Sequence, residues 1–309
     1  MTVVVTGVAG FIGSHLARRL LDQQVQDVVG IDCLTDYYEP SLKRSNLSGL
    51  LGDPRFRFEQ LDLAQDGADF VADASCVYHL AGQPGVRMSW GDGFASYVRN
   101  NIVATHRLLE AMRESTGRLV FASSSSVYGD ADRYPTTEDS LPQPSSPYGV
   151  TKLCSEQLVM AYARSAGLDA RCVRYFTVYG PRQRPDMAFS RFIAAAQRGE
   201  PVEIYGDGQQ TRDFTYVSDA VDATVRAGSV TDAGKRIFNV GGGSRATVLD
   251  VLRILGDILG KPLDVRRLPP QPGDVRDTGA DLSRARDTLG WSPRVTLANG
   301  LRAQVKASA

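Results

Sequence analysis

Residues 2–16 of this 309-residue chain, TVVVTGVAGFIGSHL, determine the expected fold class. Val3–Val5 is an apolar, β-branched run typical of a buried strand, and the helical pattern of Ile12–Leu21 follows it closely. The turn between them has a GxxGxxG spacing that starts at Gly7. Glycines there permit a tight turn, so a pyrophosphate can approach the positive end of the helix. A strand-to-helix turn that binds no ligand would have the same spacing. Further residues must therefore show whether this turn binds a pyrophosphate.

Short apolar runs alternate with helical periods through about the first 175 residues. The predicted strands are Val3–Val5, Val28–Ile31, Arg57–Leu61, Cys76–Leu80, Leu119–Ala122 and Ala170–Tyr175. The predicted helices are Ile12–Leu21, Val98–Arg113 and Tyr148–Ala163. This order predicts an α/β fold with a doubly wound parallel sheet, Rossmann-like, because each parallel pairing needs a crossover.

Beyond Arg174 the alternation loosens, and Pro-rich connections appear at 180–181 and 269–273. We therefore expect residues 1–174 to form a dinucleotide-binding domain. Residues 175–309 should form a smaller mixed α/β substrate lobe, with some segments returning to the first domain. A ligand cleft is expected where the two meet, at the carboxyl ends of the strands.

The charge balance argues against nucleic acid and membranes as partners. The 35 basic residues equal the 35 acidic ones, and no basic run forms a stripe. No apolar stretch reaches the roughly 20 residues that span a bilayer, and no leader pattern precedes Val3, so we expect a soluble cytoplasmic protein. The four cysteines lie far apart without metal-like spacing, which favours reduced thiols in packing roles and no metal site.

Asp32 ends the second predicted strand, 19 residues after Gly13, where a carboxylate can accept both hydroxyls of an adenosine ribose. No Arg adjoins Asp32 to bind a 2′-phosphate, so the pattern favours NAD over NADP. A strand-end cap is the alternative role for Asp32. Asp62 and the segment Leu80–Gly82 follow later strands and could contact the cofactor or form ordinary loops. His79 is expected to be a core residue rather than a catalyst.

A possible base lies at the start of the third predicted helix. Ser146 and Pro147 are typical of a helix start, and they place Tyr148 and Lys152 at i and i+4 on one face. A cation or a helix N-terminus can lower the pKa of a phenol enough for it to act as a base. Such a pair also occurs by chance on surfaces. The four serines at 123–126, at the end of a strand, add a hydroxyl donor and favour carbinol oxidation.

With these motifs the sequence closely resembles the extended short-chain dehydrogenase/reductase superfamily, in its nucleotide-sugar epimerase/dehydratase branch. The resemblance covers essentially the whole chain. It rests on TGVAGFIGSHL, HLAGQPGVRMSW, the Asn100-Asn101 pair, SSSSVYG, SPYGVTK, RYFTVYGP and YGDGQQTRDF.

The resemblance implies tightly held NAD, with Tyr148 as base, Lys152 orienting the nicotinamide ribose and lowering the phenol pKa, and Ser124 bonding the sugar O4. Asn101 would support the active-site backbone. The cofactor-binding residues implied by motif and resemblance are Gly7, Gly10, Phe11, Ile12, Gly13, Asp32, Asp62, Leu63, Leu80, Ala81, Gly82, Asn101, Tyr148, Lys152 and Tyr175. The substrate-binding residues are Arg87, Ser124, Ser125, Ser126, Thr177, Arg184, Arg212 and Arg276, with Arg212 and Arg276 on a UDP diphosphate.

Departures from the family pattern select the reaction. Sugar dehydratases have Asp and Glu where this chain has Ser125 and Ser126, and UDP-glucuronate decarboxylases usually have Glu at the second position. Without that acid the elimination of water has no proton shuttle, whereas 4-epimerisation needs only oxidation, turning of a 4-keto sugar and reduction.

The stretch 177–188, TVYGPRQRPDMA, looks like that of UDP-glucuronate 4-epimerases. UDP-glucose 4-epimerases usually have Asn at the Thr177 position. Hydroxyls of Ser125, Ser126 and Thr177 would be neutral donors to a uronate carboxylate, and Arg184 could pair with it or be a solvated loop charge. The same two roles, substrate binding or a solvated loop charge, are open for Arg87. Phe189 and Phe192 are expected in the core rather than near uracil.

The leading hypothesis is NAD-dependent interconversion of UDP-glucuronate and UDP-galacturonate. The alternatives are a UDP-glucose 4-epimerase, a UDP-glucuronate decarboxylase and, outside enzymes, an NAD-sensing regulatory protein. A homodimer is expected, because helices Val98–Arg113 and Tyr148–Ala163 have wide apolar stripes and relatives commonly dimerise through two such helices.

Overall fold

The computed structural model describes residues 1–66, 68–231 and 234–308. Its centre is a parallel seven-stranded sheet in the order β11-β6-β5-β4-β1-β2-β3. The strands are β1 (Thr2–Thr6), β2 (Asp27–Ile31), β3 (Phe56–Glu59), β4 (Cys76–His79), β5 (Arg118–Ser124), β6 (Asp169–Tyr175) and β11 (Ile237–Val240). The strand order reverses between β1 and β4, so their carboxyl ends border a natural ligand crevice.

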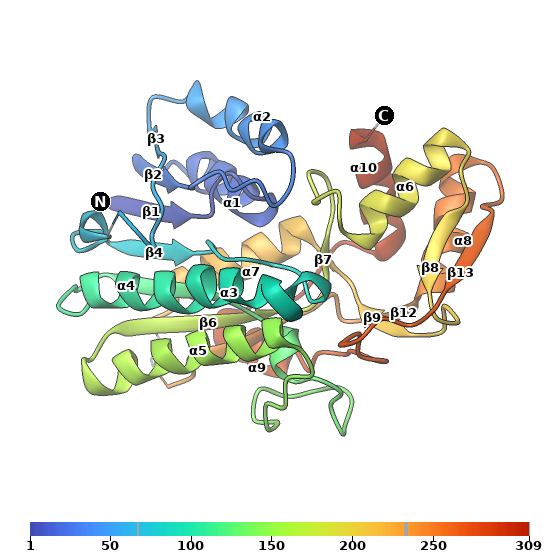
Figure 1. The fold of residues 1–309 in the computed structure, drawn as a ribbon. Helices are drawn as coiled ribbons and strands as arrows, with labels where there is room; N and C mark the ends of the chain where they lie inside the picture. The colour runs from blue at the N-terminus through green and yellow to red at the C-terminus, as the bar shows by residue number, and fades with distance from the viewer. Residues whose placement is uncertain (67, 232–233, 309) are drawn as a thin grey trace.

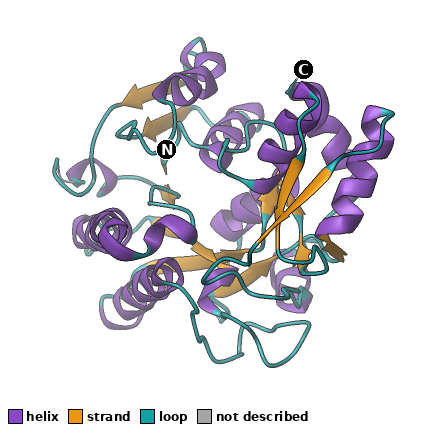
Figure 2. Ribbon diagram, turned by 45° about the vertical axis from the view of Figure 1, so that its right-hand side comes forward, coloured by secondary structure: helices purple, strands orange, loops and turns teal. Residues whose placement is uncertain are grey.

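Alternating side chains of the strands pack into two separate cores, one on each face of the sheet. Val5 belongs to one core and Val4 to the other, as period-two geometry requires. Both faces are covered by helices (Figures 1 and 2). Those helices are α1 (Phe11–Asp22), α2 (Pro40–Leu51), α4 (Ala104–Ala111), α5 (Pro147–Ser165), α7 (Val217–Ser229) and α9 (Ser283–Leu289). The doubly wound Rossmann-like fold is thereby confirmed.

Most of the predicted elements are confirmed, although their bounds shift by one or two residues, notably in three of them. The third strand ends at Glu59 rather than Leu61, because its pairing with β2 stops at Ile31. The fourth ends at His79, although the Leu80 amide still donates to the Thr6 carbonyl. The helix predicted over Val98–Arg113 begins as a π-helix, η4 (Val98–Val103), and its α-helical part ends at Ala111.

Helix α2 was not predicted. Of its four buried residues, Lys43 and Asn46 are polar, so its sequence has no continuous apolar stripe. It begins because the Glu39 side chain accepts from the Ser41 amide and Pro40 occupies the first turn. The helix packs on α1 and β3 and carries Lys43 toward the carboxyl end of β2.

A smaller lobe lies beside the carboxyl ends of β1 and β4 (Figure 1). Its parallel pair β8 (Val202–Tyr205) and β13 (Val265–Leu268) packs with α6 (Ala188–Arg198), α8 (Val248–Leu259) and α10 (Leu297–Ala307) around a third core. Phe189 and Phe192 belong to this core. Two short pairs lead into it, β7 (Val178–Tyr179) with β10 (Thr215–Tyr216), and β9 (Thr211–Asp213) with β12 (Arg245–Thr247).

The second half of the chain divides between the two lobes. Strand β11 completes the main sheet, while α7 and α9 pack against it, with Trp291 buried in the first core. Short helices η1 (Asp69–Val71), η2 (Arg87–Ser89), η3 (Gly91–Gly93), α3 (Phe94–Tyr97) and η5 (Ser125–Val127) complete the described elements. In the described part of the chain, no helix combines the length and apolar character needed to cross a membrane.

Candidate active site

A cavity of about 400 Å³ opens at the carboxyl ends of the central strands. Every residue predicted to hold the cofactor lines it, from the glycine turn to Tyr175. Ser124, Ser125, Ser126, Thr177 and Arg184 line the same cavity. Segments from the first 174 residues and from the residues that follow them therefore meet at this cavity.

The glycine turn fits a pyrophosphate. Gly7 has φ +69°, and a Cβ there would lie 2.7 Å from the Ala81 nitrogen. At Gly13 a Cβ would lie 2.1 Å from the Gly7 oxygen, so helix α1 starts against the turn itself. Gly10 caps α1 without a side-chain hydrogen bond, which leaves the first amides of the helix facing the cavity. Amides of this kind bind phosphate oxygens.

Asp32 lies where a ribose would follow the pyrophosphate. Its Oδ2 accepts from the Ala9 amide at 3.1 Å and its Oδ1 from the Leu34 amide at 2.8 Å. Burial raises the pKa of Asp32, while these amides and Lys43 oppose the rise. The Lys43 ammonium is held by Thr35, through its carbonyl at 2.7 Å and its hydroxyl at 2.8 Å.

His79 is buried in the sheet, as the sequence predicted. One ring nitrogen lies 2.8 Å from the Thr6 hydroxyl and the other 3.0 Å from the Thr105 hydroxyl. Burial lowers its pKa to about 3, so the imidazole is neutral near pH 7. Thr6 also accepts from the Ala81 amide, and this contact fixes the turn after β4 along the cavity.

The serine strand and helix α5 place the predicted catalytic groups together. The Ser146 hydroxyl accepts from the Gly149 amide and Pro147 is the first helical residue, which fixes Tyr148 in the first turn. Ser124, at the end of β5, is within hydrogen-bonding range of the Tyr148 phenol. Lys152, one turn further, is buried with its ammonium 4.5 Å from the Phe121 ring.

Burial dominates the electrostatics of this pair. It raises the pKa of Tyr148, although the Ser124 hydrogen bond and the Arg184 charge act in the opposite direction. Burial also lowers the pKa of Lys152 to about 8, while the neighbouring Cys172 and Glu156 act in the opposite direction. The Tyr97 ring packs edge-on against the Tyr148 ring, with 6.2 Å between the ring centroids, and helps to fix the Tyr148 side chain.

Asn101 joins three elements around the site. Its side-chain oxygen accepts from the Gln83 amide at 2.6 Å, and its nitrogen donates to the Thr151 hydroxyl at 2.9 Å. Its carbonyl accepts from Ser155 at 2.8 Å. Asn101 lies in η4, and the wider π turn is often found at functional sites. The turn links α5 to the loop that begins at Gln83.

Arg184 lines the cavity but already has a partner. Its Nε and Nη2 donate to the two Asp186 oxygens, each at 3.0 Å. The side chain is only 16% exposed, so it is not a solvated loop charge. Asp62 likewise pairs with Arg99 at 2.7 Å at the cavity wall.

Three predicted substrate arginines lie outside the residues that line this cavity. Arg87 pairs with Asp274 at 2.9 Å, with its guanidinium 4.0 Å from the Tyr205 ring. Arg212 donates to backbone carbonyls of its own strand and of the segment 275–276. Arg276 lies 3.7 Å from Asp207 and is largely exposed.

Several cavity residues were missed by sequence reasoning. They are chiefly Tyr37, Tyr38, Lys43, Gln83, Asn100 and Met187. The tyrosines follow β2 in a stretch without periodicity, and only their position after a strand could have identified them. Tyr37 lines the cavity, and its hydroxyl donates to the Asp186 carboxylate at 3.4 Å.

Known proteins resemble this chain over nearly its whole length. Residues 3–241 match the profile described as the NAD dependent epimerase/dehydratase family. An uncharacterized UDP-glucose epimerase of Bacillus subtilis (strain 168) is 44% identical, over 99% of this chain and 97% of its own. A UDP-glucuronate 4-epimerase of Thermodesulfobacterium geofontis is 39% identical, over 99% and 95%.

Solved structures give the same result at the level of the fold. The UDP-glucuronic acid 4-epimerase of Bacillus cereus, crystallised with UDP-glucuronic acid and NAD, superposes with a TM-score of 0.96 at 43% identity. The superposition covers 99% of this chain and 98% of that one.

Proposed function

The chain belongs to the NAD dependent epimerase/dehydratase family, and we propose that it interconverts UDP-glucuronate and UDP-galacturonate through a 4-keto sugar. It is an isomerase of the UDP-sugar 4-epimerase class, and its cofactor is NAD. In this proposal residues 1–174 hold the dinucleotide and residues 175–309 hold most of the UDP-sugar.

The observation that carries the substrate proposal is the set of groups around the catalytic tyrosine. Ser125, Ser126 and Thr177 line the cavity with hydroxyls, and Arg184 adds a cation. Ser125 and Ser126 occupy the positions that are acidic in dehydratases. Neutral donors and one arginine suit a carboxylate at C5.

The residues of this chain supply proton transfer and orientation. NAD, when bound, supplies the hydride acceptor and later returns the hydride. Tyr148 would take the proton of the C4 hydroxyl and return it, with Ser124 donating a hydrogen bond to the same oxygen. A charged Lys152 would favour the phenolate, against the burial that raises the pKa of Tyr148.

The keto sugar must turn over without losing carbon dioxide. A 4-keto uronate is a β-keto acid, and it loses carbon dioxide when the C5–C6 bond lies perpendicular to the plane of the C4 carbonyl, so that the electrons of that bond form an enolate. Hydroxyls of Ser125, Ser126 and Thr177 would hold the carboxylate in one orientation. A Glu at position 126, as in decarboxylases, would remove one of these donors.

The main competitor is a UDP-glucose 4-epimerase, which the name of the Bacillus subtilis relative favours. A UDP-glucuronate decarboxylase is the next alternative. An NAD-sensing regulator has no need of Ser124, Tyr148 and Lys152 in one cavity.

The test is incubation of the purified holoenzyme with UDP-glucuronate or UDP-glucose, with products followed by NMR. We expect UDP-galacturonate from the first at a rate well above any conversion of the second. Formation of UDP-xylose, or faster turnover of UDP-glucose, would overturn the substrate proposal.

Tyr148→Phe gives the catalytic control. Loss of the proton acceptor should lower kcat by about 10³-fold while NAD stays bound, because general acid–base groups contribute on that order. Full activity in this variant would show that another group is the base.

We also propose a homodimer formed through η4, α4 and α5. Val103 on η4 and Val150 on α5 are 40% and 46% exposed, which leaves apolar surface on these helices. Light scattering at micromolar concentration should give twice the chain mass. A single-chain mass would contradict this part of the proposal.

A further inference from the structure

A buried ion pair lies directly behind the catalytic residues. Glu156 on α5 and Arg174 on β6 are 0% and 2% exposed. The guanidinium donates through Nε and Nη2 to the two oxygens of Glu156, at 3.0 and 2.5 Å. The Ser123 hydroxyl donates to Glu156 Oε2 at 2.6 Å. Three donors therefore fix this carboxylate.

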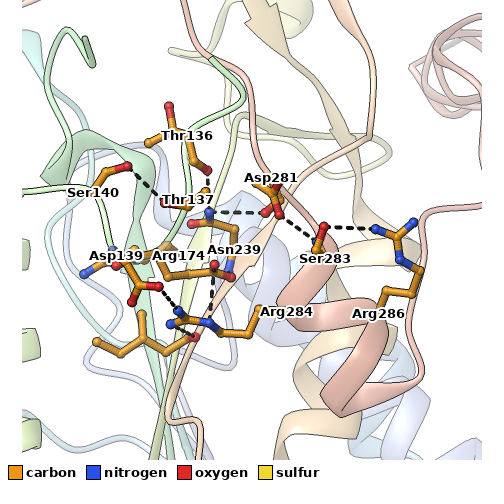
Figure 3. Close-up of polar contacts among 12 residues, drawn as sticks. Thr136, Thr137, Asp139, Ser140, Arg174, Asn239, Asp281, Ser283, Arg284 and Arg286 are labelled. Atoms are coloured by element: carbon orange, nitrogen blue, oxygen red, sulfur yellow. Dashed lines mark hydrogen bonds and ion pairs between the residues drawn. The ribbon is translucent and has the colours of Figure 1, made fainter. Parts of the chain in front are cut away.

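The ion pair continues into a polar network that leads away from the cavity. Arg174 Nη1 donates to the Tyr128 hydroxyl at 2.6 Å, and Tyr128 donates to Asn239 at 2.7 Å. The backbone N–H of Asn239 donates to Glu138 Oε1 at 2.8 Å. Arg284 lies 3.5 Å from Glu138 and closes the far end of the network. Figure 3 shows Arg284 close to Arg174 and Asn239.

Stability alone does not explain a buried pair at this place. Removing two charges from water costs several kcal/mol, and well-packed apolar residues often stabilise such a position equally or better. The position of Glu156 suggests a second role. It lies four residues after Lys152 on α5, hence on the same helix face, and its bond to Ser123 is adjacent to Ser124.

The charged and titratable groups around Lys152 come from three elements. Tyr148 and Glu156 lie on α5 itself. His79 faces it from β4, and burial lowers the pKa of His79 to about 3. Cys172 faces it from β6 beside Arg174, and burial raises the pKa of this thiol well above its usual range. Near pH 7 the imidazole and the thiol are therefore neutral.

Glu156, which forms the ion pair with Arg174, lies one helical turn from Lys152 on α5. We propose that Glu156, held by Arg174 and Ser123 one helical turn from Lys152, is a positioning residue that keeps the Lys152 ammonium charged in its buried site. The effect of Glu156 on the Lys152 charge does not depend on the proposed function. Only the role of Lys152 in catalysis rests on it.

The sign of the effect follows from the charges. Burial lowers the pKa of Lys152 to about 8, and Glu156 opposes this fall. Replacing Glu156 with Gln removes the opposing carboxylate and leaves the Arg174 cation unpaired. Both changes disfavour a second positive charge, so the Lys152 pKa should fall further and the ammonium should be lost near neutral pH.

The chain offers a direct way to measure this, because it has only five lysines: Lys43, Lys152, Lys235, Lys261 and Lys306. Holoenzyme labelled with ¹³C at the lysine ε-carbon gives a resolved NMR titration, and Lys152→Met assigns the signal. In Glu156→Gln we expect the Lys152 midpoint to fall by about one pH unit relative to the wild type. The pH at which kcat declines on the alkaline side should fall in parallel.

Glu138→Gln is the matched control, because Glu138 is the other buried carboxylate of the network and pairs with Arg284. It should lose stability while the Lys152 midpoint stays within about 0.2 pH unit of the wild type. Glu156→Asp should restore the midpoint. Should Glu156→Gln not fold, Glu156→Leu combined with Arg174→Met removes both charges and should still lower the midpoint.

Two results would overturn the inference: an unchanged Lys152 midpoint in a folded variant without the carboxylate, or an equal fall in Glu138→Gln. Failure of the proposed function is separate, because it would leave the wild type inactive on UDP-glucuronate without altering the NMR titration.

Discussion

The two halves of the cleft are built in different ways. On the side proposed for the cofactor, the lining comes largely from backbone: the turn from Gly7 to Gly13, the amides that bind Asp32, and the segment Leu80–Gly82. On the side proposed for the sugar, Arg184 at the cavity wall pairs with Asp186, and beyond the lining Arg87 and Arg276 pair with Asp274 and Asp207. The proposed cofactor half is therefore held by close backbone packing, whereas sugar binding by these arginines would exchange one partner for another.

The largest effect is expected at Gly13. In Gly13→Ala the new methyl group would lie 2.1 Å from a backbone oxygen, so α1 or the turn must move. We expect a loss of about 3 kcal/mol in the free energy of unfolding and protein purified without NAD. Thermal melts and the NAD released on denaturation measure both.

Gly49→Ala in α2 is the control, because a Cβ there meets no atom within 4 Å. This helix should gain about 0.5–1 kcal/mol from the added side chain. Equal NAD content in both variants would show that the turn is not rigid.

On the sugar side, Arg184→Ala should raise the KM for UDP-glucuronate by about tenfold to a hundredfold, as the loss of a hydrogen bond to a charged group implies. The KM for UDP-glucose should change little, since it has no carboxylate. Arg198→Ala, an exposed arginine outside this cavity, is the control. Equal changes for both sugars would mean that Arg184 does not recognise the C5 substituent.

The cofactor half should also be acid-sensitive through His79. Its folded pKa, about 3, is below the usual 6.5, so between these values the unfolded chain binds a proton that the folded chain does not. This contribution to stability is complete above pH 6.5 and falls by about 2 kcal/mol at pH 5. Denaturant unfolding of wild type and His79→Gln at pH 7 and pH 5 measures it. An equal loss in both would refute the assignment.

The smallest effect concerns Asp274. This partly exposed ion pair with Arg87 contributes below about 1 kcal/mol. If Arg87 exchanges Asp274 for a phosphate on binding, Asp274→Asn should lower the KM for UDP-sugars by about twofold to threefold. A raised KM would indicate that Asp274 instead orients Arg87 for the substrate.

These differences explain which elements could be predicted. The strand Val3–Val5 is apolar throughout, so composition alone indicates a buried parallel strand. Helix α2 escaped because half of its buried residues are polar. The π turn at Asn101 was not predicted, because the Asn101 side chain bonds to Gln83 and Thr151, which lie in other segments of the chain.

The site residues divide in the same way. Tyr148 and Lys152 are four residues apart, and their common face follows from helix geometry alone. Tyr37 and Asp186 lie 149 positions apart in the chain, and no spacing predicts that they meet. Arg212 belongs to a family motif that predicts diphosphate binding. In the structure its guanidinium donates to the carbonyls of Val275 and Arg276.

The sequence by itself determined the alternation of strands and helices, the glycine turn and the spacing of Tyr148 and Lys152, because these depend on neighbouring residues. Only the tertiary structure decided which arginines face the cavity and which carboxylates hold them, and that Glu156 and Arg174 meet behind Lys152. Long side chains choose their partners from the whole fold, and burial then sets the pKa of each group.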